Sequence, residues 1–199
     1  MIVTQFLQRC GFPARVATEL NDNPPDTEME IKVPHSPFMT NFIILRGKMG
    51  KGATIALIGN RRTGKTTMAT MLAYPVGKRN AGSRPIAYTT AHRFFMEVKD
   101  TFGHAATTTQ SQVMERFESP VLLVIDELDK RVDSDWENAT LFELLNWRHG
   151  ALKDTILIAN IDQDKFSRSV GPSLMARINE TGGVVVFDWP AFKKGQVAP

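Results

Sequence analysis

The loop GNRRTGKT at Gly59–Thr66 matches the phosphate-binding (Walker A) pattern GxxxxGK[ST] in full. It follows an apolar, β-rich run and opens a helical pattern, which is the context that such a loop requires. Gly59 and Gly64 let backbone N–H groups wrap a phosphate, and the helix N-terminus adds a favourable dipole. Lys65 is expected to reach the β- and γ-phosphates, and the Thr66 hydroxyl to ligate Mg²⁺. The loop therefore predicts ATP and Mg²⁺ as cofactors, with these binding residues: Gly59, Asn60, Arg61, Arg62, Thr63, Gly64, Lys65, Thr66 and Thr67.

An acidic pair ends the clearest strand pattern of the chain, VLLVIDE at Val121–Glu127 (Walker B). Ligands of open α/β sheets bind beyond the carboxyl ends of the strands, so both carboxylates are expected beside the phosphates. Asp126 is predicted to hold the Mg²⁺ shell together with Thr66, and Glu127 to orient and deprotonate the attacking water. The second carboxylate favours an ATPase over a small-molecule kinase, because many nucleotide kinases lack it as a water activator.

Two further polar side chains lie near the ends of later elements. Asn160 ends the strand pattern TILIAN, about 34 residues after Asp126, where a side-chain amide can position water. The alternative for Asn160 is a simple turn former. Arg177, in the helical pattern SLMARINE, is placed to reach the ATP of a neighbouring subunit as an arginine finger. The alternative for Arg177 is a solvent-exposed helix arginine.

Alternating strand and helix patterns are expected to position these side chains. The strand patterns are Thr54–Ile58, Pro85–Thr89, Val121–Asp126, Thr155–Asn160 and Val184–Phe187. The helix patterns between them are Thr66–Tyr74, Ala91–Phe102, Gln110–Phe117, Trp136–His149 and Pro172–Asn179. This alternation predicts an α/β fold with a parallel five-stranded sheet and helices on both faces.

The residues before the first strand read as an irregular arm. Gln5–Leu20 could hold a short helix broken by Pro13, and the proline-rich, acidic Asn21–Glu30 reads as a solvated connector. Phe38–Arg46 is apolar on one helical face. We therefore expect an N-terminal arm and helix over 1–50, which is a possible partner-binding segment, an ATPase core over 51–192 and a flexible tail over 193–199.

Composition indicates an ordinary globular domain, with 199 residues, 42% hydrophobic and 23% charged. The net charge of +3 permits nucleic-acid contact without requiring it. Cys10 is the one cysteine, which excludes an internal disulfide and a cysteine-based zinc site. No apolar run approaches the roughly 18 residues of a membrane span, and no secretory signal is visible, so a cytoplasmic location without membrane contact is predicted.

From about Thr54 to Phe192 the chain resembles the AAA+ core of the DnaC/IstB family, which comprises helicase loaders and transposon helper ATPases related to the DnaA initiator. The stretches that carry the resemblance are GNRRTGKTT, MEVKDTFG, LLVIDELDKRVDSDWE, LMARI and VVFDWPAF. The resemblance implies a three-layer P-loop (ASCE) fold with sheet order 5-1-4-3-2. As a departure from the family, no C-terminal helical lid is expected after the last strand. It also implies ATP-dependent assembly of copies into a ring or spiral, with Arg177 acting in trans. Lys193 falls where many relatives place a second ATP-sensing arginine.

By position, Phe102, Ser134 and Trp136 match residues on the single-strand-binding face of DnaC-type loaders. Aromatic rings stack on unpaired bases at about 1–3 kcal/mol each, while basic groups such as Lys99 track the phosphates. The alternative is structural, with Phe102 in the core at a helix end and Trp136 as a staple at a helix start.

The resemblance implies a DNA-binding, ATP-dependent helicase loader, and the compact chain favours an origin in a phage or other mobile element. Its partners would be single-stranded DNA and a DnaB-type replicative helicase. Loaders of this type carry a larger N-terminal domain, whereas about 50 residues precede the first strand here. Two alternatives remain open at this point: a transposition helper acting on duplex DNA, and a nucleotide-switched binding adaptor with little turnover.

Overall fold

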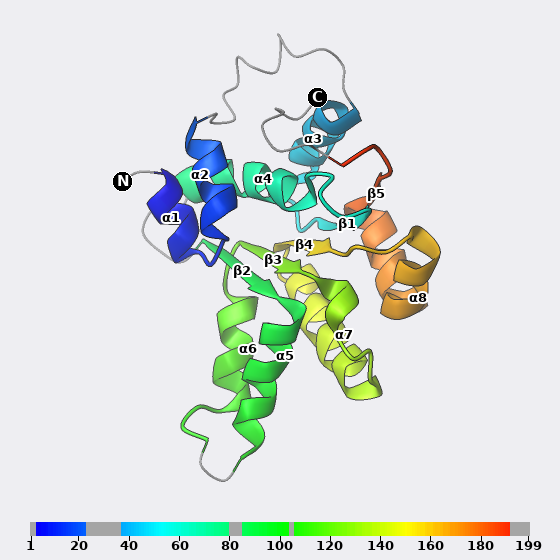
Figure 1. Ribbon diagram of the computed structural model, residues 1–199. Coiled ribbons are helices and arrows are strands. Elements are labelled where there is room, and N and C mark those ends of the chain that lie inside the picture. Colours follow the sequence, from blue (N-terminus) through cyan, green and yellow to red (C-terminus); the bar gives the residue numbers. More distant parts are fainter. Residues whose placement is uncertain (1–2, 23–36, 80–84, 104–105, 192–199) are drawn as a thin grey trace.

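A parallel sheet forms the centre of the molecule in the computed structural model, which describes residues 3–22, 37–79, 85–103 and 106–191 (Figure 1). Its strands are β1 Thr54–Gly59, β2 Ile86–Thr90, β3 Leu122–Asp126, β4 Asp154–Ile158 and β5 Gly183–Phe187. The spatial order is β2-β3-β4-β1-β5, with every neighbouring pair parallel. The predicted order is therefore confirmed, and the carboxyl ends of β1, β3 and β4 meet at one edge.

Helices cover both faces of this sheet and complete three layers (Figure 1). One face carries α1 Val3–Arg9, α2 Ala14–Asp22, α3 Pro37–Lys48 and α4 Lys65–Arg79. The other carries α5 Ala91–Lys99, α6 Gln110–Glu118, α7 Asp135–Gly150 and α8 Gln163–Thr181. Side chains alternate along β1, so that Ile55 and Leu57 enter the first core, and Ala56 and Ile58 the second. Because β1, β3 and β4 are buried on both faces, they are nearly continuous apolar runs in the sequence.

The last helix is longer than predicted. α8 starts after an N-cap at Asp162, whose side chain accepts from Lys165 N at 2.8 Å, and it buries Phe166 and Val170 before the predicted start at Pro172. Gly171, with φ 77°, kinks the helix ahead of this proline. The backbone is not helical at Gly171, so a second helical segment of α8 begins at Pro172 as predicted, whereas the segment before Gly171 was missed.

A second difference lies at the end of α5. The predicted helix ran to Phe102, but α5 ends at Lys99 and a single 3₁₀ turn, Asp100–Phe102, follows. This turn places Phe102 at the surface.

The N-terminal segment is more ordered than the predicted irregular arm. The helix break at Pro13 is confirmed, but α1 and α2 lie against the sheet, where Leu7, Phe12 and Ala17 are buried in the same core as β1. α2 also runs to Asp22, so that a connector can start only after it. The remainder of the predicted connector, Lys193 and the predicted tail lie outside the described residues. None of the described helices has the length and apolar character needed to cross a membrane.

Candidate active site

The phosphate loop contains glycines whose backbone conformation is unfavourable for residues with a side chain. Gly59 has φ 119°, and a Cβ there would lie 2.5 Å from the Phe187 carbonyl oxygen of the adjacent strand. Gly64 has φ 95°, and α4 starts at the next residue. Trp189 supports the loop from behind by donating its Nε1–H to the Thr63 carbonyl at 2.9 Å. This support was not predicted, although Trp189 lies in the quoted VVFDWPAF stretch.

Lys65 is held inside the loop by the loop's own carbonyl groups. Its Nζ donates to the carbonyl oxygen of Gly59 at 3.0 Å and to that of Asn60, and the residue is buried. Burial lowers the pKa of the ammonium group, while the carboxylates of Asp126 and Asp129 oppose that shift. The carbonyl oxygens are neutral partners for this cation, and a bound phosphate would provide a negatively charged one.

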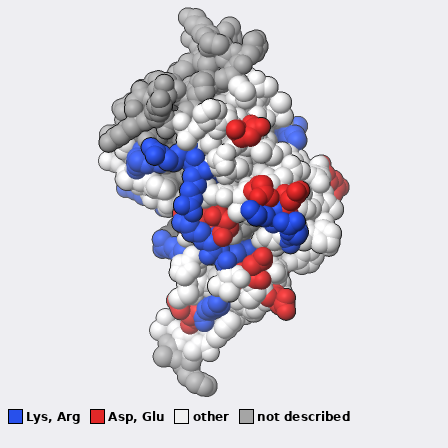
Figure 2. Space-filling model, turned by 45° about the vertical axis from the view of Figure 1, so that its right-hand side comes forward, with Lys and Arg blue, Asp and Glu red and all other residues white. Residues whose placement is uncertain are grey.

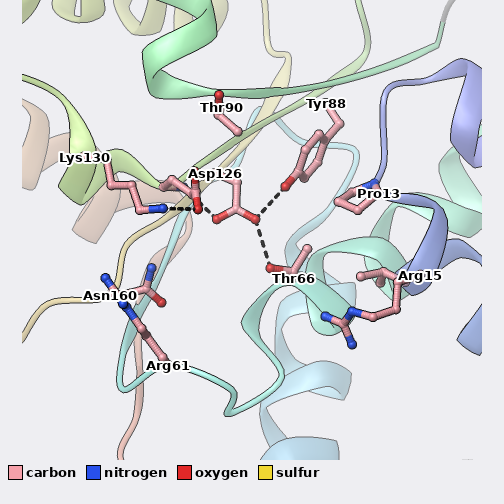
Figure 3. Close-up of a pocket in the computed structure, with 11 residues that line it drawn as sticks. Pro13, Arg15, Arg61, Thr66, Tyr88, Thr90, Asp126, Lys130 and Asn160 are labelled. Carbon is pink, nitrogen blue, oxygen red and sulfur yellow. Dashed lines mark hydrogen bonds and ion pairs between the residues drawn. The ribbon is translucent and has the colours of Figure 1, made fainter.

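Thr66 and Asp126, the two predicted Mg²⁺ ligands, are in direct contact (Figure 3). Thr66 Oγ1 donates to Asp126 Oδ2 at 2.9 Å, and the Tyr88 hydroxyl donates to the same oxygen at 2.7 Å. Burial and the neighbouring carboxylate raise the pKa of Tyr88, so its hydroxyl stays protonated. One hydroxyl and one carboxylate suit Mg²⁺, which usually takes few protein ligands and completes its shell with phosphates and water. Tyr88 is a site residue that the sequence prediction missed.

Glu127 adopts a backbone conformation that is rare for a residue with a side chain, with φ 57° and ψ 38°. Its amide donates to Asp126 Oδ1 at 2.7 Å, and its own carboxylate pairs with Lys130 Nζ at 2.5 Å. Such left-handed residues cost about 1–3 kcal/mol and cluster at functional sites. Glu127 and Lys130 both line the cavity beyond the strand, so the turn places this ion pair beside the cavity.

Asn160 reaches the same edge of the sheet, as its place after a strand predicted. Its backbone amide donates to Asp129 Oδ1 at 2.8 Å, and its side-chain Nδ2 lies 3.3 Å from the same oxygen. Asp129 was not predicted as a site residue, although it follows the acidic pair by two positions. It holds Asn160 at the cavity.

Arg177 lies elsewhere in the protomer. Its guanidinium carbon stands 5.5 Å from the centre of the Phe142 ring on α7, and Arg177 does not line the cavity of its own chain. The structure therefore leaves a role in trans as a prediction.

The cavity at this edge has a volume of about 480 Å³. Lys130, Asn160 and Arg61 lie on one side of Asp126, and Thr66, Tyr88, Pro13 and Arg15 on the other (Figure 3). Its lining also includes Val16, Thr90 and Glu127. The three residues from the N-terminal segment, Pro13, Arg15 and Val16, were missed because no local motif marks them. Of the remaining predicted loop residues, Arg62 has φ 63° and Thr67 lies in the first turn of α4.

Two of the three predicted DNA-contacting residues, Phe102 and Trp136, form with Lys99 an aromatic surface, which we define as Lys99, Phe102 and Trp136. The Phe102 and Trp136 rings lie 5.7 Å apart edge to face, and Lys99 Nζ stands 5.0 Å from the Trp136 ring. Phe102 is 58% exposed, so the alternative of a core phenylalanine is wrong. Trp136 is half-buried and contacts Phe95 of the core. This packing agrees with the alternative in which Trp136 is a hydrophobic staple at the start of a helix. Ser134 caps α7 by accepting from Glu137 N at 3.3 Å.

The charge distribution is mixed. On the face shown in Figure 2, Lys and Arg side chains form a run that borders groups of Asp and Glu. This face is not one extended basic surface, in keeping with the net charge of only +3.

Comparison with known protein families identifies the group of P-loop proteins to which this chain belongs. The profile of the family described as IstB-like ATP binding protein matches residues 49–178, well over half of the chain. The chain belongs to this family. The matched region includes the phosphate loop, the acidic pair, Asn160 and Arg177, and it confirms the resemblance inferred from the sequence.

Curated relatives are replicative helicase loaders named DnaC. The Escherichia coli K12 protein is 22% identical over 145 residues, which cover 72% of this chain and 58% of the loader. The loader of Buchnera aphidicola from Schizaphis graminum is 20% identical over 144 residues. The chain thus spans little more than half the length of the curated relatives it matches.

Solved structures share the fold. A crystal structure of the DnaC helicase loader has a TM-score of 0.63 at 15% identity, covering 78% of this chain and 93% of that one. Domain III of the Thermotoga maritima initiator DnaA has a TM-score of 0.64 at 18% identity, covering 82% and 67%. A DnaA bound to AMPPCP and single-stranded DNA has a TM-score of 0.62 at 18% identity, covering 82% and 50%. These likenesses show that the chain shares the α/β fold of these proteins.

Proposed function

We propose that this chain is an ATPase that binds Mg-ATP at the carboxyl edge of its sheet and hydrolyses it. The observation that carries the proposal is the contact of Thr66 with Asp126, beside a lysine enclosed by the phosphate loop. Lys65 would bind the β- and γ-phosphates, and Thr66 and Asp126 would hold Mg²⁺. The ion would neutralise charge on the phosphates as the terminal bond breaks.

Glu127 is the proposed base for the attacking water. Glu127 lines the cavity, and its carboxylate forms a surface ion pair with Lys130 of modest strength, which a bound nucleotide can rearrange. Asn160, fixed by Asp129, would orient the water with its side-chain amide. Proton abstraction by Glu127 then makes the water a better nucleophile toward the γ-phosphorus.

We further propose that the ATPase serves as a helicase loader of phage or mobile-element type. It would act in the cytoplasm, bind single-stranded DNA through the aromatic surface and place a DnaB-type replicative helicase. The names of the curated relatives support the loader role, and an exposed Phe102 beside Trp136 and Lys99 supports base stacking. ATP-dependent assembly into a ring or spiral would bring Arg177 of one copy to the cavity of the next.

One experiment separates the loader from its alternatives. ATP turnover is measured without DNA, with single-stranded DNA and with duplex DNA of the same sequence. Helicase capture is measured with the full chain and with Ile43→Ser and Ile44→Ser variants, because these side chains of α3 are exposed and their loss spares the core. The loader predicts stimulation by single strands and capture that these variants weaken. Stimulation by duplex alone would instead support a transposition helper, and negligible turnover under every condition would support an adaptor.

A further inference from the structure

One wall of the cavity comes from the N-terminal segment. Pro13, Arg15 and Val16 line the same cavity as Thr66, Asp126 and Glu127 (Figure 3). Arg15 lies on the Thr66 side of Asp126, opposite Arg61 and Lys130. An arginine therefore faces the phosphate-binding edge from a segment outside the P-loop core.

The position of this wall is fixed by contacts with β2. Tyr88 N donates to the Cys10 carbonyl at 2.8 Å, and the Phe12 and Tyr88 rings lie 4.8 Å apart. Gly11 has φ 96°, and a Cβ there would lie 2.5 Å from the Tyr88 carbonyl oxygen. Phe12 and Val16 are buried on either side of Arg15. The segment is thus docked closely enough to hold Arg15 at the cavity.

The charges of the cavity suit a polyanion. Its lining carries three cationic side chains, Arg15, Arg61 and Lys130, against the two carboxylates Asp126 and Glu127. A guanidinium group presents a planar fork of donors that matches phosphate oxygens. Arg15 thus shares the cavity with the predicted Mg²⁺ ligands and the predicted base, all of which would act at the terminal phosphate.

We propose that Arg15 is a phosphate ligand supplied in cis by the N-terminal segment, binding the terminal phosphate of ATP. The proposal rests on the proposed function, because it assumes that this cavity binds ATP. Since Tyr88 contacts both the segment and Asp126, docking of the segment and occupancy of the cavity are coupled. ADP lacks the phosphate that Arg15 binds, so the segment is held more tightly in the ATP state than in the ADP state.

The test compares the affinities of fluorescent ATP and ADP analogues for the full chain with Mg²⁺ present. Arg15→Ala should weaken ATP binding roughly tenfold or more, as expected for loss of a charge-assisted hydrogen bond, and leave ADP binding unchanged. Arg9→Ala is the matched control, because Arg9 is an exposed arginine at the end of α1 that does not line the cavity. Arg15→Lys should recover part of the ATP affinity, since it restores the charge without the fork.

Gly11→Ala offers an independent approach, because it displaces the segment without altering Arg15 or the phosphate loop. It should reproduce the loss of ATP affinity, and protease cleavage within residues 3–22 should no longer be slower with ATP than with ADP. If Arg15→Ala and Arg9→Ala bind ATP equally well while Lys65→Ala loses binding, the role of Arg15 is overturned and the proposed function stands. Unchanged ATP binding in Lys65→Ala would instead overturn the proposed function.

Discussion

The nucleotide cavity and the aromatic surface were both predicted from a few residues, but they are built in different ways. In the cavity, Lys65, Thr66 and Asp126 are held by hydrogen bonds to one another or to the loop backbone. On the aromatic surface, Phe102 and Trp136 are held only by ring contacts and by packing on the core. Hydrogen bonds fix direction and spacing, whereas apolar packing tolerates many arrangements.

This difference explains why the same kind of prediction is more specific in one region than in the other. A phosphate loop needs glycines at positions where a Cβ would collide with backbone, as at Gly59, so the requirement is visible in the sequence. From the sequence alone, an aromatic residue next to a helix end is equally compatible with a place in the core and with a place at the surface. Only the 3₁₀ turn after Lys99 decides that Phe102 points outward.

The largest effect is expected from Lys65→Ala, which tests whether the hydrogen-bonded cavity binds nucleotide. Removing the ammonium leaves the β- and γ-phosphate charge without its cation, so ATP binding should fall below detection. Lys51→Ala is the control, because Lys51 is exposed in the loop before β1. Both affinities are measured by titration with a fluorescent ATP analogue. Equal affinity in the two variants would mean that the cavity does not bind nucleotide through the loop.

Arg177→Ala should have the next largest effect, on turnover and not on binding. An arginine finger contributes about 10³-fold or more to the rate, so the variant should bind ATP normally and hydrolyse it poorly. Arg168→Ala, exposed on the same helix, should hydrolyse normally. Mixing Arg177→Ala with Lys65→Ala should restore activity, because each supplies what the other lacks. Co-assembly without any recovery would contradict action in trans.

Smaller effects are expected on the aromatic surface. Phe102→Ala and Trp136→Ala should each weaken single-strand binding by about 1–3 kcal/mol, roughly 5- to 150-fold, with ATP affinity unchanged. Trp147→Ala is a matched control, because Trp147 is an exposed tryptophan on the same helix with Lys153 Nζ 4.9 Å from its ring. The two tryptophans lie about 16 Å apart along α7.

The structure also separates these two variants by stability. Phe102 is largely exposed, so Phe102→Ala should leave the melting temperature close to that of the wild type. Trp136 packs against the core, so Trp136→Ala should lower the melting temperature. Fluorescence anisotropy and thermal melting on the same samples measure both properties. Normal DNA affinity in a folded Phe102→Ala protein would remove this ring from the binding face.

Much of the fold followed from periodicity. Buried parallel strands such as β3 are apolar up to their last residues, and the polar residues at these ends located the edge where Asp126 and Asn160 lie. The sheet order followed from the resemblance to a family with that order. The boundary at Gly171 and Pro172 was predicted, but the helical segment that Asp162 caps before this boundary was missed.

The missed parts of the site depend on contacts between distant segments. Tyr88 is an unremarkable strand residue until the register of β2 with β3 places it near Asp126. Arg15 lies 51 positions before Thr66 in the sequence, and it reaches the cavity only because Gly11 lets the segment approach β2. No local pattern encodes such approaches.

The central claim is that this edge of the sheet both binds and hydrolyses ATP, and Glu127→Gln tests it most directly. The substitution keeps the shape of the side chain and removes the base, so ATP affinity should equal that of the wild type while turnover falls by about 10²–10⁴-fold. Glu115→Gln, an exposed glutamate on α6, should match the wild type in both measurements. Affinity and single-turnover hydrolysis are measured on the same preparations. Wild-type turnover in the Glu127→Gln protein would contradict the account.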